Sequence, residues 1–310
     1  NIMLDKLASW DTIDFSSSSD AEITKILKKL NIPLSIDEVK KIQFSFLNRP
    51  ATLTELVLFS IQGSEHSSYK SSKNHIKHFL TDGDHVILGA KDDAGVVSLS
   101  VDDNGNRYGL VVSHESHNHP SQIVPYEGAA TGVGGNVRDV CCMGAEVMSL
   151  GDSLRFGDID RNKTKWISDG VVSGIAGYGN PLGIPNICGD LYFDKEYNEN
   201  CLVTVLTAGV VKEKNVIRSK APTNSVNYDL ILVGKPTDNS GFGGASFASL
   251  ELEEEKEQQN KGDVQEPNAF LERHILKSTY ALFDYLEENN LINRVGFKDL
   301  GAGGVACASI

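Results

Sequence analysis

The sequence predicts an α+β fold, and three observations lead to that class. Apolar stretches at 85–88, 95–99 and 108–112 are separated by turns rich in Asp, Asn and Gly, which is typical of antiparallel strands. Apolar residues recur with helical spacing at 21–46 and again near 268–289. Because antiparallel-looking strands are mixed with helices, α+β layers are favoured over a doubly wound parallel sheet.

Short helices with recognisable caps are expected at the start of the chain. Ser35 offers an N-cap for a second helix, after the helix predicted near 23–30. Thr52 and Glu55 form a capping box, which predicts that a third helix begins there.

The Gly-rich segment at 128–135 is expected to lead into a helix. Further elements are expected downstream: strands at 146–151, 201–211 and 229–234, a helix near 167–178 and a second Gly-rich turn at 241–244. A change in composition near 212–228 predicts a domain boundary. The chain then divides into a helical segment at 1–50, a first domain at 51–215 and the start of an α/β domain at 216–310.

Composition narrows the classes of function. The 310 residues carry a net charge of −13, from 29 Lys and Arg against 42 Asp and Glu, which disfavours binding to nucleic acid. The 5 cysteines contain no C-x-x-C pair, so we expect reduced thiols in a cytoplasmic protein. No stretch approaches the roughly 18 consecutive apolar residues of a membrane span, so no association with a membrane is expected.

The residues that carry chemistry are concentrated at 113–139. Three His and one Glu fall within the six residues 114–119, directly before Pro120. If this stretch is an extended strand that ends at Pro120, alternation places Glu115, His117 and His119 on one face. Imidazole suits proton transfer near neutral pH, but a zinc site or a simple loop cap stays open from these residues alone.

The glycines at 128–135 favour close approach of the backbone to an anion at the start of a helix. Their spacing matches neither the phosphate-binding loop that ends in Lys-Ser/Thr nor the dinucleotide fingerprint. Arg138 and Asp139 would lie on the first turns of that helix, where Arg suits a phosphate and Asp suits Mg²⁺.

Several motif blocks occur in order from about residue 52 to the end of the chain. The central blocks are Glu-Ser-His-Asn-His-Pro-Ser at 115–121, Pro-Tyr-x-Gly-Ala-Ala-Thr-Gly-Val-Gly-Gly at 125–135 and Arg-Asp-Val at 138–140. The others are Ser-Glu-His-x-x-Tyr at 64–69, Gly-Gly-Ala-Ser-Phe-Ala-Ser at 243–249 and Asp-Leu-Gly-Ala-Gly-Gly at 299–304. Together they resemble the signature of the formylglycinamidine ribonucleotide synthetase family, and their shared order is far more specific than any single block.

The resemblance implies an ATP- and Mg²⁺-dependent ligase with the two-domain fold of aminoimidazole ribonucleotide synthetase. The family converts formylglycinamide ribonucleotide and ammonia to formylglycinamidine ribonucleotide in purine biosynthesis, through an iminophosphate. A glutaminase subunit and a small bridging subunit are the expected partners, because they deliver the ammonia. The alternatives are a sister enzyme (aminoimidazole ribonucleotide synthetase, selenophosphate synthetase or a thiamine phosphate kinase) or a non-catalytic assembly fragment.

The resemblance also implies roles for individual residues. It maps the proton acceptor to His117 and a second active-site histidine to His66. The other roles map as follows: substrate contacts to Ser116, His117, Asn118, His119, Arg138 and Gln265, nucleotide contacts to Tyr69 and Ser113, and metal ligands to Glu115, Asp139 and Asp299.

Two departures from the family pattern bear on the site and on the extent of the chain. Ser113 stands where members commonly have a nucleotide-binding Lys, so one positive charge is missing. Stand-alone members carry two such halves, so we expect this chain to be the N-terminal half of the synthetase subunit.

Overall fold

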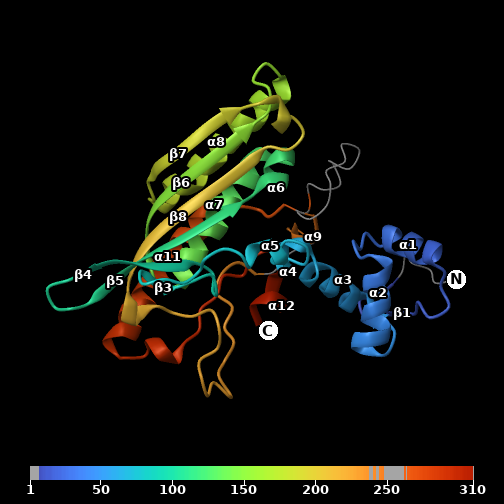
Figure 1. The fold of residues 1–310 in the computed structure, drawn as a ribbon, viewed down its shortest axis with the longest axis horizontal. Coiled ribbons are helices and arrows are strands. Elements are labelled where there is room, and N and C mark those ends of the chain that lie inside the picture. The colour runs from blue at the N-terminus through green and yellow to red at the C-terminus, as the bar shows by residue number, and fades with distance from the viewer. Residues whose placement is uncertain (1–6, 237–239, 242–243, 248–261, 263, 310) are drawn as a thin grey trace.

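Figure 1 shows a computed structural model of the protein, which describes residues 7–236, 240–241, 244–247, 262 and 264–309. A six-stranded sheet forms its centre, and the predicted α+β class is confirmed. The strand order is β3 (Val86–Leu88), β4 (Gly95–Val101), β5 (Arg107–Ser116), β8 (Leu202–Lys212), β6 (Glu146–Phe156) and β7 (Asn186–Phe193). Neighbouring strands are antiparallel, apart from the parallel pair of β6 and β7.

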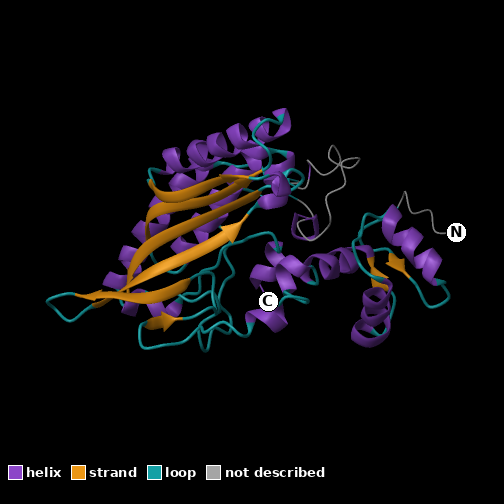
Figure 2. Ribbon diagram, turned by 45° about the horizontal axis from the view of Figure 1, so that its top comes forward, coloured by secondary structure: helices purple, strands orange, loops and turns teal. Residues whose placement is uncertain are grey.

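Helices cover one face of this sheet. The layer consists of α6 (Asn118–Ile123), α7 (Pro125–Cys142) and α8 (Asn162–Leu182), with α11 (Ala269–Glu288) packed against α7 and α8 (Figures 1 and 2). Alternate residues of β8, from Val203 to Val211, are buried beneath the helices. This alternation is expected of a strand that turns one face to the core.

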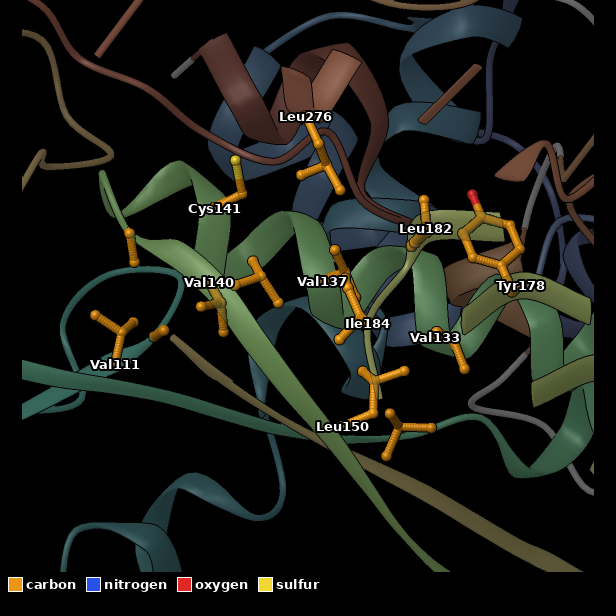
Figure 3. Packing of buried hydrophobic residues seen from close by; sticks show 14 of the residues in the cluster. Val111, Val133, Val137, Val140, Cys141, Leu150, Tyr178, Leu182, Ile184 and Leu276 are labelled. Atoms are coloured by element: carbon orange, nitrogen blue, oxygen red, sulfur yellow. The ribbon is translucent and has the colours of Figure 1, made fainter. Parts of the chain in front are cut away.

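Figure 3 shows the core between the sheet and the helices. Val133, Val137 and Val140 form one apolar stripe on α7 because they are spaced by four and three residues. The stripe belongs to the same cluster as Val111 of β5 and Leu150 of β6. Burial of a valine or leucine contributes roughly 1.5–3 kcal/mol, so this stripe fixes how α7 lies on the sheet.

A second, smaller core lies near the N-terminus. It involves α1 (Asp20–Lys29), α2 (Ile36–Lys41), the π-helix η2 (Ile42–Leu47), α3 (Leu53–Gln62) and a small sheet of β1 (Thr12–Ile13) and β2 (Ala51–Thr52). The predicted N-cap at Ser35 and the capping box at Thr52 are both present. The remaining short elements are α4 (Glu65–Ser68), α5 (Lys73–Ile76), η3 (Lys195–Tyr197), η4 (Glu213–Asn215), α9 (Gly244–Phe247), η7 (Ile292–Arg294) and α12 (Gly304–Ser309).

Most predicted elements are present, but one strand is not. The strands at 85–88, 95–99, 108–112, 146–151 and 201–211 form, and the two long helices are α8 and α11. The strand predicted at 229–234 is wrong: these residues are not paired, and Leu230 and Ile231 are largely exposed. An apolar run becomes a strand only where a neighbour satisfies its backbone N–H and C=O groups. Conversely, β7 is absent from the sequence prediction, because both of its faces are exposed and it lacks a buried apolar pattern.

The Gly-rich segment lies inside a helix and not before one. α7 begins at Pro125, a residue that suits the first turn because its missing N–H has no intrahelical partner there. The predicted helix start after Gly135 is therefore wrong. Arg138 and Asp139 lie in the second half of α7, so the free N–H groups of the helix start are not beside them. Parts of the 241–244 turn and of the 243–249 block lie outside the described residues.

The strand predicted to continue to Pro120 is also shorter than expected. β5 ends at Ser116, and His117 precedes the first turn of α6. Pro120 is tolerated in that first turn, where its N–H is not needed. Strand alternation therefore does not place His117 and His119 on the face of Glu115, and their positions depend on α6.

None of the described helices is both long enough and apolar enough to cross a bilayer.

We predict that Gly128→Ala destabilises the protein by about 1–3 kcal/mol, because the added methyl overpacks the contact between α6 and α7. A Cβ at this position would lie 2.5 Å from backbone atoms of Pro120 and Ser121. The matched control in the same helix is Gly135→Ala, whose Cβ would meet nothing closer than 3.7 Å. This control should be neutral or stabilising by up to about 1 kcal/mol. Urea unfolding of both variants measures the difference, and equal stabilities would contradict the tight contact.

Candidate active site

All the candidate site residues line one cleft with a volume of about 1370 Å³. They come from segments far apart in the chain: His66, Tyr69, Ser113, Glu115, Ser116, His117, Asn118, His119, Arg138, Asp139, Gln265 and Asp299. The cleft lies where the end of β5 meets α4, α6 and α7. The structure thus brings together every residue to which the resemblance assigns a role.

The start of β8 holds α6 at the end of β5. The N–H of His117 donates to the carbonyl of Val203 at 2.8 Å, and the N–H of Val203 donates to Asn118 Oδ1 at 2.8 Å. One turn further, Gln122 Oε1 accepts a hydrogen bond of 2.9 Å from the N–H of Cys201. The His-Asn-His segment is therefore fixed by the sheet, and the side-chain oxygen of Asn118 already has a structural partner.

His117 lies in a tight contact with α7. A Cβ at Gly132 would lie 2.9 Å from the Cβ of His117, so this approach requires glycine. The Nδ1 of His117 is buried without a hydrogen-bond partner among the described residues. Burial is the main cause that lowers the pKa of His117 to about 4; the backbone of Gly128 opposes this shift and the nearby His66 adds to it. The imidazole is therefore neutral at pH 7 and can accept a proton.

The carboxylate of Glu65 closes the loop that carries His66 and Tyr69. Its oxygens accept hydrogen bonds from the hydroxyl groups and the backbone N–H groups of Ser71 and Ser72. These bonds lower the pKa of Glu65 to about 2, the hydroxyl of Ser71 contributing most. Inside the loop, Tyr69 adopts a left-handed conformation with φ of 51°, which is uncommon for a bulky residue. The closed loop places both side chains on the wall of the cleft.

Four carboxyl groups converge beside the end of β5. Burial, together with the charges of Glu115, Asp299 and Asp93, raises the pKa of Asp139 to about 10. Ser113 Oγ donates to Asp139 at 3.4 Å and accepts from Asn136 Nδ2 at 2.9 Å. Ser113, at the usual Lys position, therefore contributes a hydroxyl group to Asp139 and no charge.

These carboxylates have the chemistry of a Mg²⁺ site, because hard oxygen ligands and crowded negative charge both favour a divalent cation. Asp299, however, is turned toward Arg138, whose Nε donates to it at 2.7 Å. No three His, Cys, Asp or Glu side chains in the described part of the chain are placed to hold one ion together. The predicted ligands Glu115, Asp139 and Asp299 thus meet in one cleft but are not arranged as a coordination shell in this conformation.

The guanidinium of Arg138 forms ion pairs with two carboxylates. In addition to Asp299, Glu272 of α11 accepts from Arg138 Nη1 at 2.7 Å. Burial acts to lower the pKa of Arg138, but the charges of Asp299 and Glu272 raise it well above its usual value. The guanidinium is a fixed positive charge beside the acidic cluster.

The sequence reasoning missed several residues of this site. Lys298 Nζ pairs with Asp93 at 2.5 Å, and the N–H of Asp299 donates to Asp93 at 3.1 Å. Asp93 belongs to a Lys-Asp-Asp-Ala-Gly segment that is typical of a surface turn, so no local signal marks it. Glu272 is equally hidden, because it is one acidic residue of an amphipathic helix.

The remaining candidates lie at the edges of the cleft. Ser116 is the last residue of β5 and is exposed, and His119 lies in the first turn of α6. Gln265 is held by its backbone, since Thr131 Oγ1 donates to its carbonyl at 3.2 Å. His114 pairs with Leu206 across the sheet and alternates with Ser113 and Glu115, so it turns to the other face.

Acid should destabilise the protein through His117. Its folded pKa of about 4 lies below the ordinary value of 6.5, so the unfolded chain binds the proton more readily. The contribution of His117 to the free energy of unfolding is therefore constant above about pH 6.5. It should fall by about 3 kcal/mol between pH 6.5 and pH 4.

Urea unfolding of the wild type and of His117→Asn, at about pH 7 and about pH 4.5, measures this contribution. The variant should lose less stability on acidification than the wild type. The exposed His78→Asn variant is the control and should follow the wild type. Equal losses in all three proteins would show that His117 is not held neutral by burial.

Two protein families match the chain. Residues 91–211 match "AIR synthase related protein, N-terminal domain", and residues 23–70 match "Formylglycinamide ribonucleotide amidotransferase linker domain". A curated relative from Methanothrix thermoacetophila, the phosphoribosylformylglycinamidine synthase subunit PurL, is 49% identical over 297 residues. That match covers 94% of this chain and 38% of the relative.

Solved structures of PurL from Thermotoga maritima have the same fold. The complex with FGAR superposes with a TM-score of 0.70 at 33% identity, covering 89% of this chain and 41% of that one. The complex with ATP gives 0.66 at 32% identity, covering 89% and 39%. The chain thus spans less than half the length of the relatives it matches. Its sequence, its fold and the order of its motif blocks place it in the phosphoribosylformylglycinamidine synthase PurL family.

Proposed function

We propose that the chain is the ribonucleotide- and ATP-binding part of a ligase that converts formylglycinamide ribonucleotide and ammonia to formylglycinamidine ribonucleotide. The observation that carries the proposal is the meeting of two histidines, an arginine and a carboxylate cluster in one cleft. Similar structures have been solved with FGAR and with ATP. The chemistry requires those groups together, because a phosphoryl transfer and a proton transfer occur at one amide.

The proposed reaction has two steps. The amide oxygen of the ribonucleotide attacks the γ-phosphorus of ATP, which gives an iminophosphate and ADP. Ammonia then adds to the amide carbon, and the C–O bond breaks to release phosphate with its electron pair. His117 accepts the proton that the amide nitrogen loses in the first step, since its imidazole is neutral. The proton that ammonia loses in the second step leaves with the released phosphate. A bound anionic ligand would raise the low pKa of His117 toward neutrality, where proton transfer is most effective.

In this proposal, carboxylates of the cleft bind the metal and an arginine binds the anionic group of the substrate. Glu115 and Asp139 would hold Mg²⁺, which screens the charge of the phosphates when bound. Asp299 would join them by sharing or leaving its bond to Arg138. Arg138 would contact an anionic group of the substrate, because guanidinium groups bind phosphate and carboxylate through paired N–H groups.

We further propose that ammonia comes from a partner glutaminase subunit, assisted by a small bridging subunit. The curated relative is itself named as a subunit of its synthase. The chain's own buried thiols are poor nucleophiles, because burial raises the pKa of Cys141 and of Cys201 to about 12. The rest of the subunit would complete the ATP site, since the matched relatives are more than twice as long.

Mg²⁺ should stabilise the protein through Asp139. We expect Mg²⁺ to raise the melting temperature of the wild type, because the bound ion replaces the proton that burial and the neighbouring carboxylates hold on Asp139. Asp139→Asn should melt higher than the wild type without metal and should gain little from Mg²⁺. The exposed Asp284→Asn is the control and should respond like the wild type. Differential scanning fluorimetry with and without Mg²⁺ measures these melting temperatures. If Mg²⁺ raised the melting temperature of Asp139→Asn as much as that of the wild type, Asp139 would not be a metal ligand.

The activity itself is tested in the complete synthetase subunit. With ATP, the ribonucleotide and free ammonia, ADP release should depend on all three, and His117→Ala should lower kcat by about 10²–10⁴-fold. His78→Ala is the control for loss of an exposed imidazole and should keep wild-type kcat. Turnover that needs no ribonucleotide would overturn the proposal, as would normal kcat in His117→Ala.

A further inference from the structure

A buried polar network joins three helices behind the cleft. Glu272 of α11 is 3% exposed and accepts two hydrogen bonds on the same oxygen, Oε2. One comes from Nη1 of Arg138 on α7 and the other from the hydroxyl of Tyr178 on α8, each at 2.7 Å. The second oxygen, Oε1, is buried without a partner among the described residues. A carboxylate in this position is costly to bury, so its pairing with Arg138 is needed to keep it there.

The packing of α7 is adapted to this network. A Cβ at Gly134 would lie 2.7 Å from the hydroxyl oxygen of Tyr178 and 2.8 Å from its ring, so the tyrosine reaches Glu272 only because residue 134 is glycine. Tyr178 is itself 4% exposed. The hydroxyl thus makes a directed contact inside the core, where an apolar ring alone would serve for packing.

The network leaves one side of the guanidinium open. Nε of Arg138 donates to Asp299, Nη1 donates to Glu272, and Nη2 has no hydrogen bond to any described residue. The side chain is 29% exposed and lines the cleft. Two carboxylates on two different nitrogens fix both the position and the plane of a guanidinium, because its N–H groups point in fixed directions.

We propose that Glu272 and Tyr178 are positioning residues, which hold Arg138 so that its Nη2 faces the anionic group of the ribonucleotide. The inference rests on the proposed function, because it takes Arg138 as a substrate contact. Neither Glu272 nor Tyr178 touches the substrate itself. Tyr178 fixes Glu272, and Glu272 fixes Arg138.

The test uses the complete synthetase subunit, and it measures binding by calorimetry and turnover kinetics. Tyr178→Phe removes only the hydroxyl, and Glu272→Ala removes the carboxylate. Each should weaken binding of the ribonucleotide by about tenfold, as loss of an outer hydrogen-bond partner does for other ligating side chains, and leave the KM for ATP unchanged. Glu272→Gln keeps an acceptor and should recover part of the affinity.

Two controls separate positioning from a general loss of packing. Tyr280→Phe removes the hydroxyl of a partly buried tyrosine on α11, which accepts from the N–H of Val147 at 3.1 Å, and it should leave ribonucleotide binding unchanged. In an Arg138→Lys background, Tyr178→Phe should have no further effect, because Lys lacks the paired N–H groups that Glu272 orients. Equal loss of affinity for ribonucleotide and ATP, or additive effects in the Arg138→Lys background, would overturn the inference.

The outcome also distinguishes this inference from the proposed function. If the wild type binds no ribonucleotide, the proposed function fails. Thermal stabilisation by inorganic phosphate then tests the positioning of Arg138. A phosphate response that Arg138→Lys and Tyr178→Phe both lose, and that Tyr280→Phe keeps, would support positioning for another phosphorylated ligand. A response that Tyr178→Phe keeps, or no response in the wild type, would overturn it.

Discussion

The close approach of α7 to its neighbours is the constraint on which the site depends. Gly128 admits the backbone of α6, Gly132 admits the side chain of His117, and Gly134 admits the ring of Tyr178. At each position a Cβ would lie less than 3.0 Å from a neighbouring atom. The valine stripe of the same helix packs on the sheet. One helix therefore joins the hydrophobic core to the cleft, and glycine sets the distance between them.

The electrostatics of the cleft follow from that close packing. Helix α7 carries Arg138 and Asp139 side by side, and the neighbouring elements surround them with acidic groups. Burial and like charges raise the pKa of Asp139, whereas two carboxylates stabilise the charged guanidinium of Arg138. The guanidinium of Arg138 and the acidic side chain of Asp139 thus lie within one helical turn of each other. The cleft thus places a guanidinium directly beside a cluster of carboxyl groups.

The parts of the cleft differ in how firmly they are held. His117 and Asn118 are bonded to the backbone of β8, so they are as rigid as the sheet. Tyr69 instead lies on a loop that depends on the carboxylate of Glu65. Asp299 is attached by its bonds to Arg138 and Asp93. The cleft therefore combines a centre that is bonded to the sheet with walls that are held by charged hydrogen bonds.

The sequence by itself determined the helix caps at Ser35 and Thr52 and most of the strands, because those signals are local. The candidate cleft residues instead followed from a resemblance that depends on motif blocks in a shared order along the chain. The sequence could not show that the glycines lie within a helix, because they are needed for close contacts with segments that only folding brings near. It also missed the pairing of Arg138 with Glu272, 134 positions away, because one acidic residue on an amphipathic helix carries no local mark. Tertiary structure decided these contacts, and with them the burial and charge that set the chemistry of His117.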